Sequence, residues 1–389
     1  MERGGGALTE MPLRVLLDVR HSRDFGIGTY IRNLVAAFAK IDAEDRFIIV
    51  GRPGDLAEFG KLPENFQVIE YKRSGDELWD QVAFPWFARS FSPDLYHIPL
   101  NAVSPLMPKP YVVTIHDMSV LMFADPTQRR PRLLDYRFRK GLERADRVIA
   151  VSSATRRDVE KLLGIPAQRI RQIYNAPDPR FLAPQTADGE TNARILQRYG
   201  IEYPYLLYAG NIRIQKNIPR LVEAFAVVRG ELESHPVYRD LRLIIIGDEI
   251  AKNPAVRRAI FQTRVEQAVR FLGFVPLETL RVFYEAAAAF VFPSLYEGFG
   301  LPPLEAMACG TPVVTSGVSS LPEVVGDAAM LVNPENVFDI ARGIREVLLD
   351  ERLRQRMIER GRLQVKRFSW ERTAAEVLDV YRDVAGRRN

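Results

Sequence analysis

The chain has 389 residues, with 54 Lys or Arg against 49 Asp or Glu, which gives a formal net charge of +5. This length suits two domains with substantial cores, and 47% apolar with 26% charged residues is typical of a globular protein. We find no apolar run long enough to span a bilayer and no signal-peptide pattern. The charge excess is spread along the chain, without zinc-ligand spacing or an arginine-rich arm, so we expect no nucleic-acid partner.

Two local features concern the compartment and the start of the chain. Residues 1–11 are rich in glycine and polar side chains, and we expect a disordered leader there. The single cysteine, Cys309, cannot form an internal disulfide, which suits a reducing cytosol. Since Cys309 lies among Ala306, Met307 and Ala308, we expect a small core residue rather than a nucleophile.

The first strand–loop–helix unit contains two closely spaced glycines. Leu13–Val19 is predicted to be a buried strand and Thr29–Lys40 an amphipathic helix. Between them, Gly26 and Gly28 would let the backbone approach a phosphate or a sugar. The pattern G-x-G-x-x-I lacks the third glycine of a dinucleotide fingerprint, and a plain tight turn explains the loop equally well.

A histidine and an aspartate end the strand at the middle of the first half. Strands are predicted at Arg46–Val50, Phe66–Glu70 and Leu95–Ile98, and then the apolar run Y-V-V-T-I-H-D ends in His116 and Asp117. Ligands of open α/β sheets bind at the carboxyl ends of strands. His116 is therefore a candidate site residue, although a lone histidine is more often structural.

The segment Thr127–Arg144 carries seven Arg or Lys and two acids, interleaved with Leu133, Leu134, Tyr136, Phe138 and Leu142. A basic amphipathic segment of this kind can lie on an anionic membrane surface. The alternative is a helix whose charged face is solvated and whose apolar stripe packs on its own core. The excess of positive charge suggests an acidic partner, such as a lipid-linked diphosphate acceptor.

The first half ends with a strand at Arg147–Val151, a helix capped by Ser152 or Ser153, and a strand at Ile170–Asn175. The stretch A-P-D-P-R-F-L-A-P-Q-T-A-D-G-E-T that follows is rich in proline and polar residues and has no periodicity. We therefore expect a first domain over residues 12–180, a linker over 181–203, and a second domain over 204–368.

The second half restarts the alternation of strands and helices. Tyr205–Ala209 is a predicted strand, followed by the loop G-N-I-R-I-Q-K-N and a helix from Ile218. Lys216, near that helix start, can neutralise a phosphate, although a solvated surface lysine would also fit. Further strands are predicted at Leu243–Gly247 and Phe271–Val275, before a helix at Thr279–Ala288.

The most informative stretch is Phe292–Thr311, which reads as a strand end, a glycine-rich turn and a short helix. Gly298 and Gly300 are expected to take positive φ and to bring bare N–H groups up to a ligand. Pro302 and Pro303 suit the first helical turn. A helix start of this kind attracts anions through unpaired N–H groups and the helix dipole.

Two carboxylates accompany this predicted anion site. Glu297 lies in the turn and Glu305 in the helix, where both can accept hydrogen bonds from hydroxyls. A ligand that combines a phosphate for the anion site with hydroxyls for the two carboxylates is a sugar nucleotide. Paired carboxylates also fit a glycoside hydrolase, in which two acids flank the scissile bond, but Lys216 would then have no role.

The spacing of Glu297 and Glu305 within E-G-F-G-L-P-P-L-E-A-M-A resembles the signature of glycosyltransferase family 4. The alternation of strands and helices predicts an α/β chain of two doubly wound domains. The resemblance covers nearly the whole chain and implies that they form a GT-B fold, with two Rossmann-like domains facing across a cleft. In such folds the terminal helix, here 369–389 with Ser369 as N-cap, crosses back to the first domain.

The resemblance also implies roles for individual residues. Glu297 would hold the hydroxyls of the donor sugar, Glu305 those of the ribose, and His116 would lie near that sugar. The leaving diphosphate would meet Lys216 and the main chain of residues 299–301, namely Phe299, Gly300 and Leu301.

A second cation is usual in the family just after Gly210, where this chain has Asn211; Arg213, two residues on, is the candidate replacement. The segment that ends at Val275 resembles the one near the nucleotide base. No D-x-D pair appears, so we expect no metal ion and no cofactor apart from the donor substrate.

Together these features favour a hexosyltransferase acting on a glycan or lipid-linked acceptor in the cytoplasm, with peripheral contact at the inner membrane face as an option. The resemblance implies that the enzyme retains the anomeric configuration. The loop G-N-x-x-x-x-K-N resembles the mannosyl-transferring branches, which favours GDP-mannose. A UDP-glucose-type donor stays open, as does a protein of another class, a non-catalytic sugar-nucleotide-binding module.

Overall fold

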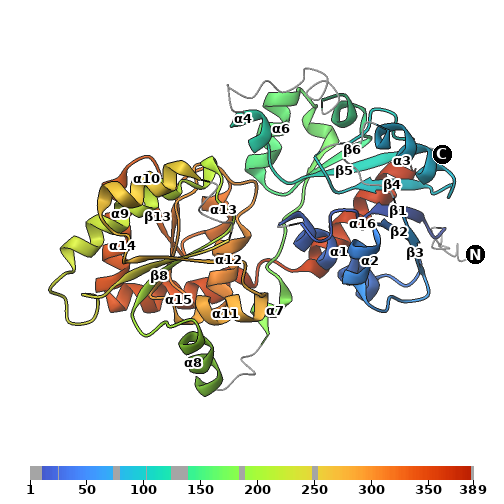
Figure 1. Cartoon of the computed structure of the whole chain (residues 1–389). Helices are drawn as coiled ribbons and strands as arrows, with labels where there is room; N and C mark the ends of the chain where they lie inside the picture. The colour runs from blue at the N-terminus through green and yellow to red at the C-terminus, as the bar shows by residue number, and fades with distance from the viewer. Residues whose placement is uncertain are drawn as a thin grey trace, which may run out of the picture.

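The chain folds into two α/β domains that lie side by side (Figure 1). This computed structural model describes residues 11–24, 26–72, 79–101, 103–123, 139–183, 189–247 and 253–386. Residues 1–10 of the predicted leader and residues 127–138 of the basic segment lie outside the described residues.

The N-terminal domain is built on a seven-stranded parallel sheet in the order β3-β2-β1-β4-β5-β6-β7. Its strands are β1 (Arg14–Asp18), β2 (Arg46–Gly51), β3 (Phe66–Glu70), β4 (Leu95–Ile98), β5 (Tyr111–Ile115), β6 (Arg147–Ala150) and β7 (Ile170–Gln172). The central strands are buried along their whole length, as expected of parallel strands covered on both faces.

Helices cover both faces of this sheet. They are α1 (Ile27–Ile41), α2 (Pro53–Leu56), α3 (Asp80–Arg89), α4 (Ser119–Met122) and α6 (Ser153–Leu163), with short 3-10 turns η1 (Ala57–Phe59) and η2 (Ala167–Arg169). One core cluster joins α1 to Val15, Leu17 and Val112, and the other joins α3 and α6 to Leu16 and Val113. The alternation of strand residues between the two clusters follows the period of two.

The C-terminal domain repeats the design with a six-stranded parallel sheet in the order β10-β9-β8-β11-β12-β13. Its strands are β8 (Tyr205–Ala209), β9 (Arg242–Ile246), β10 (Val269–Gly273), β11 (Ala289–Phe292), β12 (Val313–Ser316) and β13 (Met330–Val332). In both sheets the order reverses beside the first strand, so each domain is doubly wound as expected.

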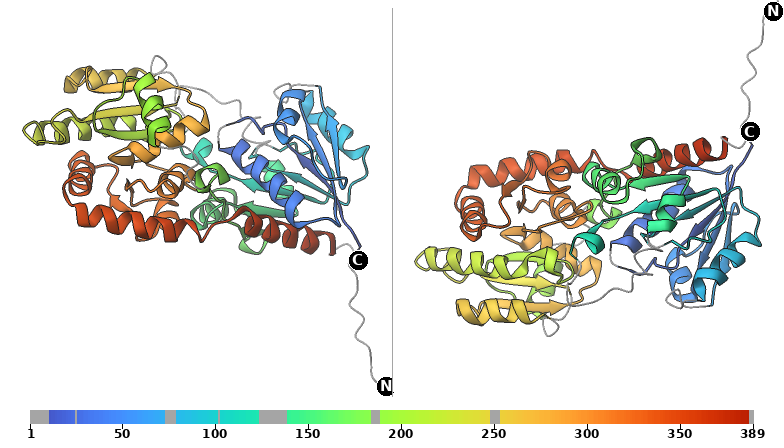
Figure 2. Two further views of the ribbon diagram at one scale, coloured as in Figure 1. Left: turned by 90° about the horizontal axis from the view of Figure 1, so that it is seen from below. Right: turned by 90° about the horizontal axis from the view of Figure 1, so that it is seen from above.

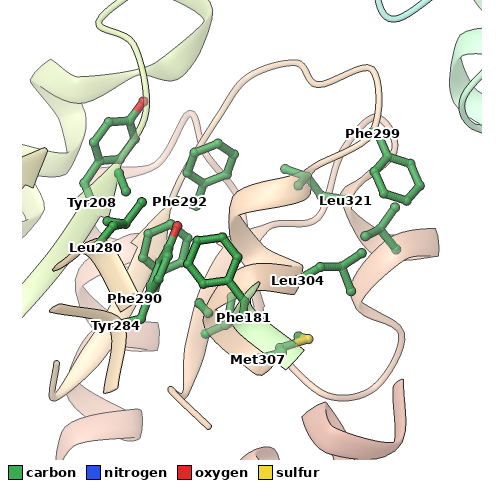
Figure 3. Packing of buried hydrophobic residues seen from close by; sticks show 14 of the residues in the cluster. Phe181, Tyr208, Leu280, Tyr284, Phe290, Phe292, Phe299, Leu304, Met307 and Leu321 are labelled. Carbon is green, nitrogen blue, oxygen red and sulfur yellow. The ribbon is translucent and has the colours of Figure 1, made fainter. Parts of the chain in front are cut away.

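The helices of this domain are η3 (Ile214–Lys216), α9 (Ile218–Glu231), α10 (Pro254–Thr263), α11 (Leu277–Ala286), α12 (Leu301–Ala308), α13 (Leu321–Val325), α14 (Val337–Leu349) and α15 (Glu351–Val365). Aromatic rings fill the core beneath α12, with Tyr284, Phe290 and Phe292 in contact (Figure 3). Cys309 ends α12 partly buried, and burial raises the pKa of its thiol, which disfavours the nucleophilic thiolate.

The connection between the domains is more structured than we expected from its sequence. The predicted linker, 181–203, contains the end of α7 (Pro179–Leu182) and the whole of α8 (Gly189–Arg198). Phe181 packs edge-on against Tyr284, with ring centroids 5.7 Å apart, and Arg281 donates to the carbonyl of Ala183 at 2.7 Å. The connection is therefore docked on the C-terminal domain, where Asn192 of α8 also donates to Glu285 on α11 at 3.1 Å.

The last helix, α16 (Trp370–Gly386), returns from the C-terminal domain and packs along the N-terminal domain (Figure 2). It begins at Ser369, whose Oγ accepts from the N–H of Arg372 at 3.1 Å. Its apolar stripe is buried against α1, and its Tyr381 hydroxyl lies 2.5 Å from Nδ1 of His97 on β4. Within the described residues, no helix is long and apolar enough to cross a bilayer.

Candidate active site

A cleft of about 650 Å³ opens between the domains, at the carboxyl ends of both sheets. The N-terminal domain contributes the loop after β1 and the end of β5, and the C-terminal domain contributes the loops after β8, β10 and β11. Twelve of the predicted site residues line it: Gly26, His116, Asn211, Arg213, Lys216, Val275, Glu297, Gly298, Phe299, Gly300, Leu301 and Glu305. Segments far apart in the sequence thus meet at one place.

The start of α12 presents main-chain donors to the cleft. Gly300 caps the helix with φ 113°, and Leu301, Pro302 and Pro303 form the first turn. A helix start leaves four N–H groups without partners inside the helix. Pro302 and Pro303 have no N–H group, so only two of these four positions carry a donor. The free donors are thereby concentrated at Gly300 and Leu301, both of which line the cleft.

The carbonyl groups of the same loop are held away from these donors. The carbonyl of Glu297 accepts from the hydroxyls of Ser319 at 2.6 Å and Ser320 at 2.9 Å. Ser320 also donates to the carbonyl of Phe299 at 2.7 Å. With its acceptors occupied by these hydroxyls, the loop suits a negatively charged ligand.

Gly298 serves a different purpose from the one we predicted. Its φ is not among the positive values found in the chain, whereas that of Gly300 is. A Cβ at Gly298 would lie 1.6 Å from the carbonyl oxygen of His116, in the other domain. Glycine is therefore required here because the two main chains touch across the cleft floor.

Gly28 is the predicted residue that does not line the cleft. Helix α1 begins two residues earlier than expected and includes Gly28, where a Cβ would lie 2.3 Å from the carbonyl oxygen of Ser22. This close packing within the domain explains why position 28 is a glycine. Gly26, the N-cap with φ 71°, does face the cleft.

Lys216 and Glu297 form an ion pair in the cleft, with Nζ 2.5 Å from Oε1. Their side chains are only 14% and 10% exposed. The lysine, at the end of η3, also lies 5.4 Å from the centre of the Phe292 ring. Because water is largely excluded, the interaction between a phosphate and the ammonium group of Lys216 would be strong. When a phosphate binds to Lys216, the carboxylate of Glu297 can accept hydrogen bonds from the hydroxyls of the ligand instead.

Glu305 is held in an environment that favours its protonated form. Burial raises its pKa to about 7, and the nearby charge of Asp178 acts in the same direction. The hydroxyl of Tyr284, 3.3 Å from Oε2, partly opposes this shift. A buried acid with its pKa near neutrality marks a candidate functional site.

We expect nucleotide affinity to depend on the ionisation of Glu305, because ribose hydroxyls would be accepted by its carboxylate. Since folding raises its pKa from 4.5 to about 7, the native state binds the proton more tightly, and stability falls as pH rises through that window. Binding that requires the carboxylate should strengthen about tenfold from pH 6 to pH 8. Titration calorimetry in buffers of different ionisation heat measures the proton released.

The matched variant is Glu305→Gln, in which any remaining pH dependence comes from the ligand's own phosphate. We expect this variant to bind nucleotide more weakly and to lose most of the slope. A slope that stays the same in Glu305→Gln would show that Glu305 does not contact the ligand.

His116 is neutral and has a defined tautomer. Burial lowers the pKa of its imidazole to about 4, and Nε2 lies 3.1 Å from the carbonyl oxygen of Pro99. A carbonyl only accepts, so Nε2 carries the proton and Nδ1 is left as an acceptor. The ring also packs edge-on against Tyr30, with centroids 4.9 Å apart. It can orient a hydroxyl but carries no charge to offset a phosphate.

The loop after β8 brings two polar side chains to the cleft beside Lys216. Gly210 has φ 150°. A Cβ at Gly247 would lie 1.9 Å from the carbonyl oxygen of Gly210, so the two main chains are in close contact. The Oδ1 atom of Asn211 is buried and has no hydrogen-bond partner among the described residues. Arg213 is exposed at the rim. Both remain candidates to contact a ligand.

Sequence reasoning missed some lining residues, chiefly Asn175 and Tyr284. Asn175 is 4% exposed, and its Oδ1 has no hydrogen-bond partner among the described residues. A buried polar group without a partner is uncommon, which suggests a ligand contact. The only signal in the sequence for Asn175 was its place after the last strand of the first half. Tyr284 belongs to a helix, and nothing in the sequence marked it as a site residue.

These features define a two-domain α/β protein whose cleft suits an anion and a polyol at once. Two family models match the chain, "Glycosyltransferase Family 4" over residues 26–181 and "Glycosyl transferases group 1" over residues 193–364. O-antigen chain mannosyltransferase B of Escherichia coli is 34% identical over 299 residues, which is 76% of each chain. The protein therefore belongs to this glycosyltransferase family, as the Glu297–Glu305 motif indicated.

A second relative agrees with this assignment, and two solved structures share the fold. Serotype-specific mannosyltransferase WbdA of Escherichia coli is 30% identical over 69% of this chain and 33% of its own length. Sucrose-phosphate synthase from Thermosynechococcus elongatus has the same fold, with a TM-score of 0.75, 22% identity and coverage of 96% of this chain and 98% of that one. Anabaena HepE in complex with UDP-glucose has a TM-score of 0.76 at 16% identity, covering 95% and 100%. The GT-B fold is thereby confirmed.

Proposed function

We propose that this glycosyltransferase moves a hexose, with mannose favoured, from a nucleoside-diphosphate sugar to a hydroxyl of a glycan or lipid-linked acceptor, and that it retains the anomeric configuration. The observation that carries the proposal is the Lys216–Glu297 pair beside the start of α12. One small, largely buried site thus offers a cation and main-chain donors for a diphosphate together with a carboxylate for sugar hydroxyls.

The chemistry follows from where charge develops. As the bond between the sugar and the diphosphate breaks, negative charge grows on the leaving oxygen. Lys216 and the N–H groups of Gly300 and Leu301 are fixed before the reaction, so they stabilise this charge without rearranging. Since these groups are a cation and main-chain donors, we propose that no metal ion is needed. Glu305 would hold the ribose and His116 would orient the sugar.

Mannose from GDP-mannose is favoured because two relatives with 34% and 30% identity are mannosyltransferases. HepE, whose structure contains UDP-glucose, shares the fold at 16% identity, so a UDP-sugar is the alternative donor. A non-catalytic sugar-nucleotide-binding protein is the alternative of another class. The pairing of Glu297 with Lys216 argues against a glycoside hydrolase, whose two acids must both be available to the glycosidic bond.

A thermal-shift screen with GDP, UDP and their sugars tests the donor, because a ligand that binds only the native state raises the melting temperature. We expect the largest shift with GDP-mannose, followed by turnover when an acceptor is supplied. Binding without either transfer or slow donor hydrolysis would instead identify a binding module.

A lipid-linked acceptor would bring the protein to the inner membrane face, and helix α3 has a surface suited to it. Trp79, just before the helix, and Trp86 are 73% and 79% exposed, with the exposed Val82 between them on the same face. Loop residue Ser104 donates to the carbonyl of Gln81 at 2.6 Å and so brings Leu106, 57% exposed, beside this stripe. Tryptophan favours the bilayer interface.

Positive charge accompanies the stripe. Arg89 is exposed at the end of α3, and the exposed Arg144 donates to the carbonyl of Pro105 in the same loop. We therefore propose peripheral contact between this α3 surface and anionic lipid, in a protein of the cytoplasm. Residues 139–144 also end the basic segment identified in the sequence.

Replacing both Trp79 and Trp86 by serine should weaken binding to anionic vesicles by about tenfold for each tryptophan lost. Co-sedimentation with vesicles of phosphatidylglycerol measures this, and neutral phosphatidylcholine vesicles should bind less. Phe261→Ser, which removes a side chain that is 74% exposed on α10, is the matched control and should change nothing. Equal binding of the double variant and the wild type would remove α3 from the contact.

A further inference from the structure

Helix α6 of the N-terminal domain is bound at its start by a carboxylate from the other domain. Glu323, on α13, accepts from the main-chain N–H of Ser153 at 3.1 Å and of Ala154 at 2.9 Å. The hydroxyl of Tyr174 donates to the same carboxylate at 3.0 Å. A helix start carries unpaired donors and partial positive charge, which a carboxylate stabilises. Both oxygens of Glu323 are thus used across the domain boundary.

The residues of α6 that follow hold the glycine-rich loop of the C-terminal domain. Thr155, which is fully buried, donates from Oγ1 to the carbonyl of Gly298 at 2.9 Å. Tyr296, 5% exposed, donates to Asp158 at 2.8 Å, and its hydroxyl accepts from the N–H of Met118 at 3.1 Å. These hydrogen bonds join the loop before α12 to the N-terminal domain.

The geometry explains what such contacts control. The loop of residues 296–300 and the start of α12 face the cleft on one side and α6 on the other. Glu323, Thr155 and Tyr296 are not among the residues that line the cleft. They can therefore affect a bound ligand only through the position of the loop and of one domain relative to the other.

We propose that the first turn of α6 is the surface onto which the C-terminal domain closes, and that Glu323 and Thr155 are positioning residues for sugar transfer. This inference rests on the proposed function. The diphosphate would lie on groups of the C-terminal domain, Lys216 and the start of α12, whereas His116 belongs to the N-terminal domain. The contacts of α6 set the distance between these two halves of the site.

The experiment compares Glu323→Ala and Thr155→Val with the wild type. The affinity for the donor nucleotide should stay within about twofold of the wild type; calorimetry with the nucleotide that the thermal-shift screen selects measures it. In Glu323→Ala, kcat should fall about 10²-fold, because small misplacements of reacting groups are costly. Glu323→Gln, which keeps one acceptor oxygen, should recover part of the loss. Small-angle scattering should show a larger radius of gyration for Glu323→Ala. Glu359→Gln, an exposed acid on α15, is the control.

The outcomes separate the inference from the proposed function. Unchanged kcat and unchanged scattering in Glu323→Ala, or nucleotide affinity that falls in parallel with kcat, would overturn the positioning role. If the wild type transfers no sugar, the proposed function fails, and the scattering comparison alone then decides whether α6 is the closing surface. Thr155→Val removes a single hydroxyl without changing size, so it tests the same contact if Glu323→Ala does not fold.

Discussion

Replacing Lys216 by alanine should lower the rate of sugar transfer by about 10³-fold, the largest effect we expect from a single change. Its ammonium group is a largely buried cation of the cleft, 2.5 Å from Glu297 and close to the start of α12. Without it, the growing charge of the leaving diphosphate would meet an unpaired carboxylate. Steady-state kinetics with the donor found by thermal shift measures the loss as kcat.

Stability must be followed in the same variant, because removing one partner of a buried ion pair leaves the other charge uncompensated. The melting temperature of Lys216→Ala should fall and recover in the double variant Lys216→Ala, Glu297→Gln, while transfer stays lost. Lys366→Ala, at the exposed end of α15, is the control. Transfer above about a tenth of the wild-type rate in folded Lys216→Ala would exclude electrostatic stabilisation of this size at Lys216.

Replacing Glu297 by glutamine should lower kcat by about 10²-fold, since a hydrogen bond to a charged group is worth about 1.5–3 kcal/mol. Glutamine keeps the size of the side chain and one acceptor, so the loop and its contacts with Ser319 and Ser320 stay in place. The same change frees Lys216 from its ion pair. Affinity for the free nucleotide should therefore stay equal or increase while transfer is lost.

This opposite response of binding and turnover distinguishes a sugar-holding carboxylate from one that only supports the loop. Calorimetry with the nucleoside diphosphate and with the sugar nucleotide gives the two affinities. If Glu297→Gln weakened the free nucleotide as much as it slowed transfer, Glu297 would be a support of the phosphate site. Glu359→Gln again serves as the exposed control.

The sequence predicted most of the cleft because parallel sheets bring the carboxyl ends of their strands to one edge. His116 follows β5, the Lys216 loop follows β8 and the Glu297 loop follows β11, so strand positions placed each of them at the carboxyl edge of its own sheet. The resemblance to the GT-B fold implied that these two edges face each other. The two doubly wound domains followed from the alternation of strands and helices. Strand order was not predicted, since it depends on which strands pair rather than on any local pattern.

Contacts between distant segments were beyond the sequence. Nothing local shows that Lys216 and Glu297, 81 residues apart, form an ion pair, or that Glu323 reaches α6. The reason for each glycine was ambiguous in the sequence as well. Gly300 is needed for its positive φ, whereas Gly298 is needed because another main chain approaches it. Composition cannot distinguish these causes.

The path of α16 has a consequence for the order in which the protein is completed during synthesis. Domains generally fold one after another from the N-terminus as the chain emerges from the ribosome. Here α16 shares with α1 the cover of one face of the N-terminal sheet, and its Tyr381 and Val384 are buried in that core. The domain that is translated first therefore lacks part of its apolar cover until α16 has been translated, and a nascent chain stalled before Trp370 would leave that part of the core exposed to solvent or to a chaperone.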